Sequence, residues 1–459
     1  MQGRLLKFAG ALALYPARML FGWYLGLVGL GTALLMAPGT RAAGADPLGL
    51  VDAIFTAASA ACVTGLMVTP STEFSLTGQV ILLGLIQLGG LGIMSIATLL
   101  FVGITQRQPV HFRLLTKETL GAPVGTDLMG LLLKVVGLTL AAELAGTAML
   151  FLARAGEAPA GELLWWSLFH AVSAFCNSGI SLQQDSLAAW SGNAGVLLTV
   201  GVLVIAGGLG FPVLIDIVKG GRKWAGGRRL TVHTKLVLSA SGVLLLAGAL
   251  SFWLLERDGA LAGVGQAEAV TVAFFHSASA RTAGFATLEL GGLSNATLFV
   301  LMLLMFVGGG PCSTAGGVKV TTLSVLVLQG AAQAGRRWQT AAFGRRVPAP
   351  VLVTATVVVA VQGLILITGL MAILVIQGGD VPHEASRQDF LDTLFETTSA
   401  LGTVGLSTGL TAELKDPSRL VVAGMMVLGR VGPLAIASLL MRRPAGARIR
   451  FPEEEIIVG

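Results

Sequence analysis

Long apolar stretches alternate with short polar connections along almost the whole chain. Each apolar stretch is near or above the roughly 20 residues that an α-helix needs to cross the hydrocarbon core of a bilayer. The pattern therefore predicts an all-α integral membrane protein with eight transmembrane helices, at about 19–37, 78–105, 127–153, 193–218, 235–255, 293–330, 351–376 and 418–441.

A shorter stretch rich in Ala, Ser, Thr and Gly lies between the members of each successive pair of apolar runs. These stretches occupy about 48–70, 162–185, 268–289 and 388–410. They are too short to span a bilayer. We expect each to enter the membrane and return on the same side, as a re-entrant pore helix followed by a loop.

The four short stretches are copies of one another. Each has a phenylalanine, then a Ser-Ala pair, then one glycine followed by an apolar residue; the serines are Ser59, Ser173, Ser279 and Ser399, and the glycines are Gly65, Gly179, Gly284 and Gly405. Self-similarity at a regular spacing indicates a repeat architecture. The sequence predicts four units around a central pore, each made of a helix, a re-entrant pore loop and a second helix. The boundaries of the units are 1–120, 121–230, 231–345 and 346–459.

Re-entrant backbone has a clear physical use in a membrane. Polar backbone groups that are not paired in a helix cannot face lipid, so such segments are buried or line a water-filled cavity. A short helix followed by an extended strand places carbonyl oxygens where they replace the hydration shell of a cation. Small residues also serve ordinary helix packing, but four copies at matching positions favour a pore.

His170 and His276 follow the phenylalanine in the second and third copies. A metal or proton-relay role is one interpretation, and capping or packing at the start of a pore helix is the one we favour. Cys62 and Cys176 occupy equivalent repeat positions, which is typical of small buried residues.

The sixth apolar run, 293–330, has 38 residues and would be about 57 Å long as one helix. Because the hydrocarbon core is only about 30 Å thick, this run has to break. The break is expected where glycines and a proline disfavour helix, at 308–317. If the broken segment faces the pore, it would form an obstruction beneath the pore loops. The alternative is that the segment is only a kink in the helix. The segment is not a phosphate-binding loop, since Val318 separates Gly317 from Lys319.

Composition excludes a soluble globular enzyme, because 54% of the residues are hydrophobic and only 12% are charged. Twenty of the thirty bases lie in segments that face the cytoplasm if the amino terminus does, which predicts cytoplasmic amino and carboxyl termini. Seventeen of the 24 acids fall on the opposite side, where they attract cations. The net charge of +6 is therefore a topology signal and does not indicate nucleic-acid binding. No cleavable signal peptide is evident, and the three cysteines suggest neither zinc nor disulfides.

Several motifs resemble those of the Trk/Ktr/HKT superfamily of potassium transporters, and most closely the KtrB-type membrane subunits of bacterial Ktr systems. They are CVTGL (62–66), CNSGI (176–180), ARTAGF (280–285), GTVGL (402–406), GGGPCSTAGGVKVTT (308–322), GRVGPL (429–434) and the ending RFPEEEIIVG (450–459). The resemblance implies a homodimer in the bacterial plasma membrane, with one K+ pathway per subunit. It also implies a cytosolic nucleotide-binding regulatory ring of the KtrA/KtrC type, and often Na+ as an activator.

The same resemblance assigns roles to individual residues. The K+-binding selectivity filter consists of Val63, Thr64, Gly65, Asn177, Ser178, Gly179, Thr282, Ala283, Gly284, Thr403, Val404 and Gly405. The gate consists of Gly308, Gly309, Gly310, Pro311, Cys312, Ser313, Thr314, Ala315, Gly316, Gly317, Lys319 and Arg430. Each filter segment has one glycine, whereas the potassium-channel filter TVGYG has two.

Arg430 lies about ten residues into the final apolar run, where an arginine costs at least about 2.5–3.5 kcal/mol to insert. We expect its guanidinium to bind carbonyl oxygens freed by the broken loop, in preference to snorkelling toward an interface. The basic connections at 219–235 and 336–346 are expected to face the regulatory ring.

These features favour a gated potassium pathway. The alternative is a tightly coupled sodium/potassium or proton/potassium symporter, for which Glu143 is the only carboxylate deep in a long span. An enzyme is not expected, because no nucleophile, base or metal cluster is suitably spaced.

Overall fold

The computed structural model describes residues 16–105, 128–221, 230–379, 382 and 389–432. The predicted features at Arg222, Lys223, Arg228 and Arg229, at 433–434, and in the ending 450–459 lie outside these described residues. Within them the regular secondary structure is helical, apart from one two-residue antiparallel hairpin, β1 (Ala341–Ala342) and β2 (Arg345–Arg346).

The order long helix, short helix, second helix occurs four times along the chain. The first set is α2 (Pro16–Leu35), α3 (Leu50–Ala61) and α4 (Leu76–Thr105); the second is α6 (Leu128–Ala153), α7 (Ala160–Phe175), α8 (Ala194–Leu209) and α9 (Phe211–Gly221). The third is α10 (Val232–Glu256), α11 (Gln266–Ser279), α12 (Asn295–Phe306) and α13 (Val320–Ala334); the fourth is α14 (Ala349–Gly378), α15 (Asp389–Gly402) and α17 (Asp416–Val431). Single turns at η1 (Ser71–Glu73), η2 (Ala188–Trp190), η4 (Leu290–Gly292) and α16 (Leu410–Glu413) follow the short helices.

Side-chain caps fix the starts of several long helices. Thr231 accepts a hydrogen bond from the Thr234 amide at 3.2 Å at the start of α10, and Asn193 and Ser294 act in the same way on α8 and α12. Such caps satisfy amide groups that have no partner within the helix.

Three described helices are long and apolar enough to cross a membrane: Leu133–Ala153 in α6, α10 and α14. Helices α8 and α9, which meet at a bend of 102°, form a fourth span if they are counted together. The remaining apolar helices have 10–17 residues in their described parts. The prediction of eight full spans therefore stays a prediction.

The shorter lengths have a structural cause in the first three sets, where the second helix is interrupted. The predicted break in 293–330 is present, since α12 ends at Phe306 and α13 begins at Val320. The expectation of continuous helices at 78–105 and 193–218 is wrong. Gly92 has φ +71° inside α4, and Gly210 has φ +92° between α8 and α9. Only glycine adopts these backbone angles at little cost.

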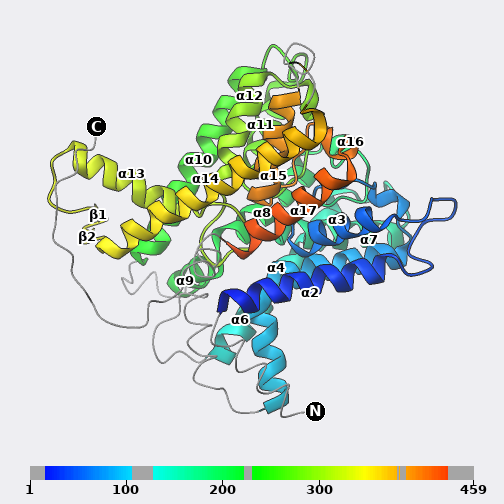
Figure 1. Cartoon of the computed structure of the whole chain (residues 1–459), viewed down its shortest axis with the longest axis horizontal. Helices are drawn as coiled ribbons and strands as arrows, with labels where there is room; N and C mark the ends of the chain where they lie inside the picture. Colours follow the sequence, from blue (N-terminus) through cyan, green and yellow to red (C-terminus); the bar gives the residue numbers. More distant parts are fainter. Residues whose placement is uncertain (1–15, 106–127, 222–229, 380–381, 383–388, 433–459) are drawn as a thin grey trace.

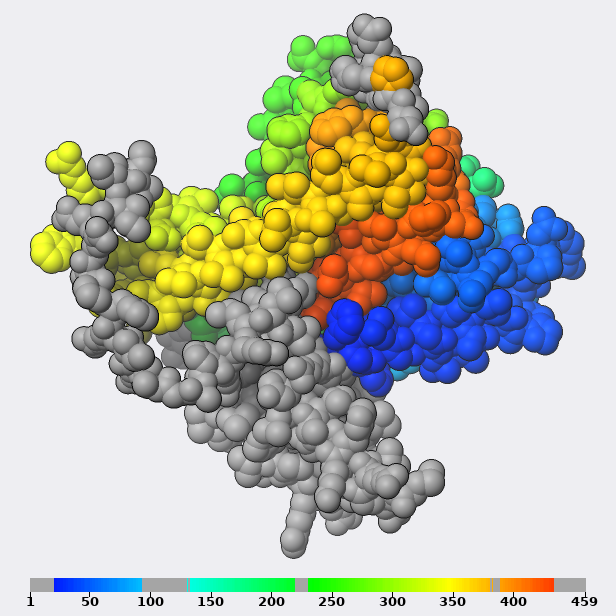
Figure 2. Space-filling model, viewed as in Figure 1, coloured from blue at the N-terminus to red at the C-terminus, as the bar shows by residue number. Residues whose placement is uncertain are grey.

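Each second helix packs against the short helix of the following set. The contacts join α4 with α7, α8 with α11, α12 with α15, and α17 with α3. The last contact closes a ring that brings together the two ends of the described chain (Figure 1). Figure 2 shows α14 beside α17 along one face of the molecule, while α13 and the hairpin extend away from the ring. The short helices with their glycines thereby lie inside the ring.

Candidate functional site

The four short helices end in the same backbone conformation. Two residues before each repeat glycine, a residue other than glycine takes a left-handed φ: Val63 (+56°), Asn177 (+59°), Thr282 (+75°) and Thr403 (+49°). The repeat glycines are left-handed as well, with φ from +71° to +98°. A positive φ in a β-branched residue costs on the order of 1–3 kcal/mol and persists only where the surroundings impose it. We call the residues 63–65, 177–179, 282–284 and 403–405 the glycine segments.

The serine of each repeated Ser-Ala pair holds its glycine segment in place. The backbone carbonyl of each serine accepts, at 2.8 Å, the amide of the residue just before the glycine: Ser59 from Thr64, Ser173 from Ser178, Ser279 from Ala283, and Ser399 from Val404. The serine hydroxyls add a second bond. Ser59 and Ser399 accept from the glycine amides at 3.0 and 3.1 Å, while Ser173 and Ser279 donate to the carbonyl beyond the glycine. These bonds explain why serine recurs in all four copies.

The four glycines form a closed ring. A Cβ added to Gly65 would lie 2.1 Å from the Ser178 carbonyl oxygen, and one added to Gly179 would lie 2.3 Å from that of Ala283. A Cβ added to Gly284 would lie 2.3 Å from the Val404 carbonyl oxygen, and one added to Gly405 would lie 2.1 Å from the Thr64 carbonyl oxygen, which closes the ring. Each glycine thus faces a carbonyl of the next glycine segment, and a side chain of any size would meet that oxygen.

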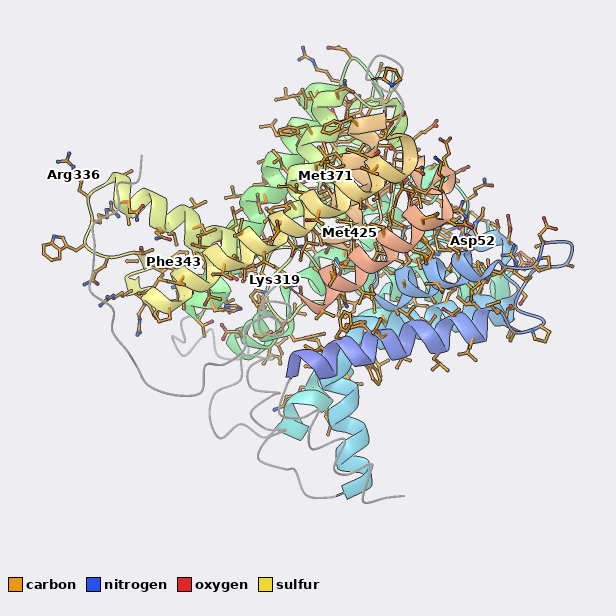
Figure 3. All side chains as sticks on the ribbon, in the orientation of Figure 1. Asp52, Lys319, Arg336, Phe343, Met371 and Met425 are labelled. Carbon is orange, nitrogen blue, oxygen red and sulfur yellow. The ribbon has the colours of Figure 1, made fainter. Side chains whose placement is uncertain are left out.

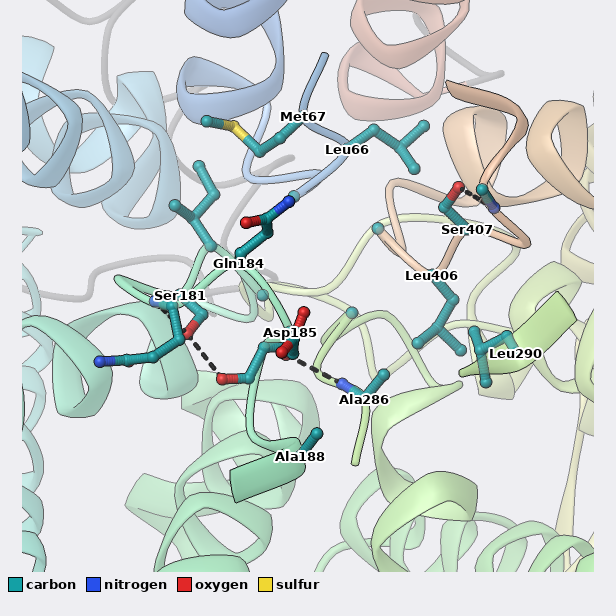
Figure 4. Close-up of a pocket in the computed structure, with 18 of the residues that line it drawn as sticks. Leu66, Met67, Ser181, Gln184, Asp185, Ala188, Ala286, Leu290, Leu406 and Ser407 are labelled. Atoms are coloured by element: carbon teal, nitrogen blue, oxygen red, sulfur yellow. Dashed lines mark hydrogen bonds between the residues drawn. The ribbon is translucent and has the colours of Figure 1, made fainter. Parts of the chain in front are cut away.

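A cavity of about 650 Å³ opens over this ring. All four glycines line it, together with the apolar residues that follow three of them: Leu66, Ile180 and Leu406. Its carboxylates are Asp185 and Glu289, and Lys and Arg are absent from its described lining. Figure 4 shows Asp185, Gln184 and Leu406 around this space. The cavity therefore presents oxygen atoms and negative charge above the ring.

Buried hydroxyl groups without a partner lie in all four glycine segments. Among the described residues, the side-chain oxygens of Thr64, Ser178, Thr282 and Thr403 are buried and make no hydrogen bond. Buried polar groups normally have partners, so each exception calls for an explanation. Neutral oxygen ligands suit a dehydrated alkali cation, whereas the described residues contain no cluster of three or more His, Cys, Asp or Glu that would suit a transition metal.

The broken loop, Gly308–Gly317, lies against the other end of the glycine segments. Thr314 donates from Oγ1 to Asn177 Oδ1 at 2.8 Å and to the Phe175 carbonyl at 3.1 Å. A Cβ on Gly316 would lie 2.0 Å from Thr403 Oγ1, and one on Gly308 would lie 3.3 Å from Thr282 Cγ2. The loop thus contacts glycine segments from three of the four sets.

Three cationic side chains hold the broken loop. Arg430 donates to the Thr314 carbonyl, to the Gly89 carbonyl at 2.8 Å and to Tyr24 Oη at 3.3 Å. Arg281 donates to the Gly308 carbonyl at 3.1 Å, and Lys319 donates to the Ala315 carbonyl at 2.6 Å. Lys319 lies near the centre of the molecule (Figure 3). The loop carbonyls are thereby fixed by positive charges from separate elements.

The expectation that His170 and His276 lie at the start of the short helices is wrong. Helices α7 and α11 begin at Ala160 and Gln266, about ten residues earlier, so both histidines fall in the carboxyl-terminal half. His170 Nε2 lies 3.0 Å from Ser181 Oγ, and His276 Nε2 lies 3.0 Å from Thr287 Oγ1. Both therefore contact the segments that follow the glycines.

Glu143 has partners that its sequence did not reveal. Gln87 donates to its Oε2 at 3.3 Å, and the Cys176 thiol lies 3.9 Å from its Oε1. Cys62 and Cys176 are buried free thiols, as expected.

A second set of glycines recurs once in each unit, and it was not predicted from the sequence. Gly89, Gly207, Gly308 and Gly429 lie 24, 28, 24 and 24 residues after the repeat glycines. Added Cβ atoms on Gly89, Gly207 and Gly429 would lie 1.9–2.1 Å from short-helix carbonyls, at Ala61, Phe175 and Leu401. These glycines allow the second helices to pass close to the short helices. Their G-x-x-G pattern at 89–92, 207–210 and 429–432 is the signal that could have identified them.

The fold and site define a class: a multi-pass helical membrane protein with four converging glycine segments. The family described as "TrkH: Cation transport protein" matches residues 35–447, and the chain belongs to this family. It is 36% identical to the Ktr system potassium uptake protein B of Vibrio alginolyticus over 95% of this chain and 93% of that one. It is 34% identical to the potassium/sodium uptake protein NtpJ of Enterococcus hirae, over 97% of this chain and 98% of that one.

A solved structure has the same fold. The potassium transporter TrkH of Vibrio parahaemolyticus superposes with a TM-score of 0.70 and 19% identity, covering 92% of this chain and 83% of that one.

Proposed function

We propose that this protein moves K+ across the bacterial plasma membrane through a pathway at the centre of the glycine ring. The observation that supports this most is the closed order of the ring, in which each glycine faces a carbonyl oxygen of the next segment. A ring of backbone carbonyls replaces the hydration shell of a cation. The relatives named as potassium and potassium/sodium uptake proteins support the same ion class.

The glycine segments act as the selectivity filter in this proposal. Carbonyl oxygens bind the ion at the level of the ring, and the unpartnered hydroxyls of Thr64, Ser178, Thr282 and Thr403 add oxygen ligands below it. Asp185 and Glu289 raise the local cation concentration in the cavity above. Each of the four sets of helices contributes one segment, as the unit boundaries at 1–120, 121–230, 231–345 and 346–459 propose.

The broken loop acts as the gate. Its contacts with the filter and with Arg281, Lys319 and Arg430 support a position on the ion path directly below the binding oxygens. Opening requires the loop to move, which breaks some of these charge-assisted hydrogen bonds.

The assembly is a homodimer with one pathway per subunit, bound to a cytosolic nucleotide-binding ring of the KtrA/KtrC type. Relatives named as subunits of Ktr systems support such partners. Both termini face the cytoplasm, on the side of the basic connections, and Na+ acts as an activator.

Ion flux in proteoliposomes tests this proposal. Purified protein is reconstituted, and K+, Rb+ and Na+ currents or tracer fluxes are compared under a clamped voltage. Selective K+ and Rb+ flux that reverses at the potassium equilibrium potential is expected. Absence of K+ flux, with or without the regulatory ring, would refute it.

A tightly coupled symporter is the second candidate. Glu143 favours it, because this buried carboxylate contacts Cys176, the neighbour of filter residue Asn177. Coupled movement of H+ or Na+ shifts the reversal potential away from that of potassium by an amount that depends on the second ion's gradient. Loss of that shift in Glu143→Gln would support coupling at this residue.

A further inference from the structure

The residue after the repeated phenylalanine occupies one structural position in all four short helices. It lies eight or nine residues before the repeat glycine and is Thr56, His170, His276 or Glu396. All four side chains are buried. In three of the four sets this side chain reaches across to the segment that follows the glycine.

Glu396 makes the most extensive contact of this kind. Its Oε1 accepts from Ser407 Oγ and from the Thr408 amide at 3.2 Å, and its Oε2 accepts from Thr411 Oγ1 at 2.6 Å. Glu396 is 1% exposed, and its hydrogen-bond partners among the described residues include no cation. Three donors from one short segment thus converge on one buried carboxylate, directly beyond Gly405.

The two histidines act at the same place with fewer bonds. His276 Nε2 accepts the Thr287 amide at 3.4 Å and lies 3.0 Å from Thr287 Oγ1. His170 is held on its other side, because Nδ1 lies 2.8 Å from the Trp166 carbonyl, and this orients Nε2 toward Ser181.

The first set lacks this connection. Thr56 Oγ1 is buried without a hydrogen-bond partner among the described residues, and the residue two positions after Gly65 is Met67, where the second and fourth sets have a serine. Thr56 therefore provides an internal control for the other three positions.

We propose that Glu396, His276 and His170 are positioning residues that fix the outer ends of three filter segments, and that Glu396 fixes its segment most strongly. The inference rests on the proposed function. The glycine ring works as a selective site only if its oxygens keep their spacing. Each of these side chains connects the outer end of a glycine segment to the short helix that holds the inner end of the same segment.

Breaking the contact lets the segment after Gly405 move, so that the ring adapts to ions of other sizes. Hydrogen bonds to an ionised group are roughly twice as strong as neutral ones, and a tenfold change in relative permeability corresponds to about 1.4 kcal/mol. Loss of one such bond is expected to lower the K+/Na+ permeability ratio by about tenfold.

The experiment compares Glu396→Gln, Ser407→Ala and the double variant with Thr56→Val, in the full protein with its regulatory ring. Zero-current potentials in mixed K+/Na+ solutions give the permeability ratio, which does not depend on the amount of active protein. We expect a lower ratio in both single variants and no additional loss in the double variant, because the two residues share one contact. Thr56→Val should keep the wild-type ratio.

Ser407→Ala and a further variant, Thr411→Val, remove one donor each and keep the test available if Glu396→Gln does not fold. An unchanged ratio in all of the folded variants, with wild-type K+ transport intact, would overturn the inference alone. Wild-type protein that carries no K+ would refute the proposed function and the inference with it.

Discussion

Replacing one repeat glycine by serine is the most direct test of the ring. Gly65, Gly179, Gly284 and Gly405 each have a left-handed φ, and each faces a carbonyl of the next segment. We expect every single Gly→Ser variant to lose discrimination between K+ and Na+ to a larger extent than it loses folded protein.

The size of the expected loss of selectivity follows from two energetic costs of adding a side chain, one of backbone conformation and one of steric contact. A residue with a Cβ costs about 1–2 kcal/mol in the left-handed region. The added Cβ would also lie 2.1–2.3 Å from a carbonyl oxygen, far inside van der Waals contact, so the backbone has to shift. Because 1.4 kcal/mol is a factor of ten, a shift that costs only the first term already corresponds to roughly a tenfold change in relative ion affinity.

The assay is competition between K+ and Na+ for Rb+ uptake, normalised to folded protein. Gly201→Ser is the matched control, since Gly201 lies in helix α8, has no positive φ, and has open space where a Cβ would be added. It should behave as wild type. Unchanged relative affinities in all four ring variants would remove these residues from the filter.

Three further predictions concern the gate, the entrance and the regulatory contact. Arg430→Ala, or shortening of the loop 308–317, should raise the maximal Rb+ flux about tenfold and loosen regulation at nearly constant ion affinity, because charged hydrogen bonds to loop carbonyls are lost. Asp185→Asn should lower the uptake rate about twofold at low ionic strength and have little effect at high salt, because salt screens the attraction of cations. Neutralising the four arginines of 336–346, which extend from the ring of helices near Arg336 in Figure 3, should weaken co-purification of the cognate regulatory ring, most clearly at low salt.

Each of these predictions has a control and a contrary outcome. Lys415→Ala changes a cation at the amino-terminal end of the same helix as Arg430. Lys415 donates to α14 carbonyls, and this variant should leave maximal flux unchanged. A folded Arg430 variant with unchanged or lower flux would contradict the gate. Asp258→Asn removes an exposed acid that does not line the cavity; an equal effect of both acids would argue against local attraction at the entrance. Wild-type affinity of the hairpin variant for the regulatory ring across a salt series would contradict docking there.

The sequence was sufficient for features that repeat or that obey membrane energetics. The short glycine-bearing stretches follow from fourfold self-similarity, and the break at 308–317 follows from a run too long for one helix. The contact of Arg430 with the loop carbonyl of Thr314 has the same origin, because a guanidinium deep in an apolar run requires acceptors that regular helices do not provide.

Other features depend on three-dimensional contacts that hydrophobicity does not encode. The bends at Gly92 and Gly210 lie inside continuous apolar runs, where glycine serves packing as often as bending. The left-handed Val63 and Thr403 are β-branched residues in a conformation they disfavour, and the bonds from Ser59 and Ser399 to the residues that follow them help to hold it. The roles of His170 and His276 depended on hydroxyls eleven residues further along the chain.

The four units differ at the position that follows the packing glycines Gly89, Gly207, Gly308 and Gly429. The residue after the packing glycine is Gly90, Gly208 and Gly309 in the first three units, and Arg430 in the fourth. A fourfold ring needs four similar segments, because each supplies one side of the site. An obstruction on the axis needs to occur only once, since the axis passes through a single point beneath the ring. If the broken loop and Arg430 form the gate, as proposed, one loop from the third unit and one arginine from the fourth are sufficient to close the pathway. The other units can then keep glycines where their helices pass close to the short helices.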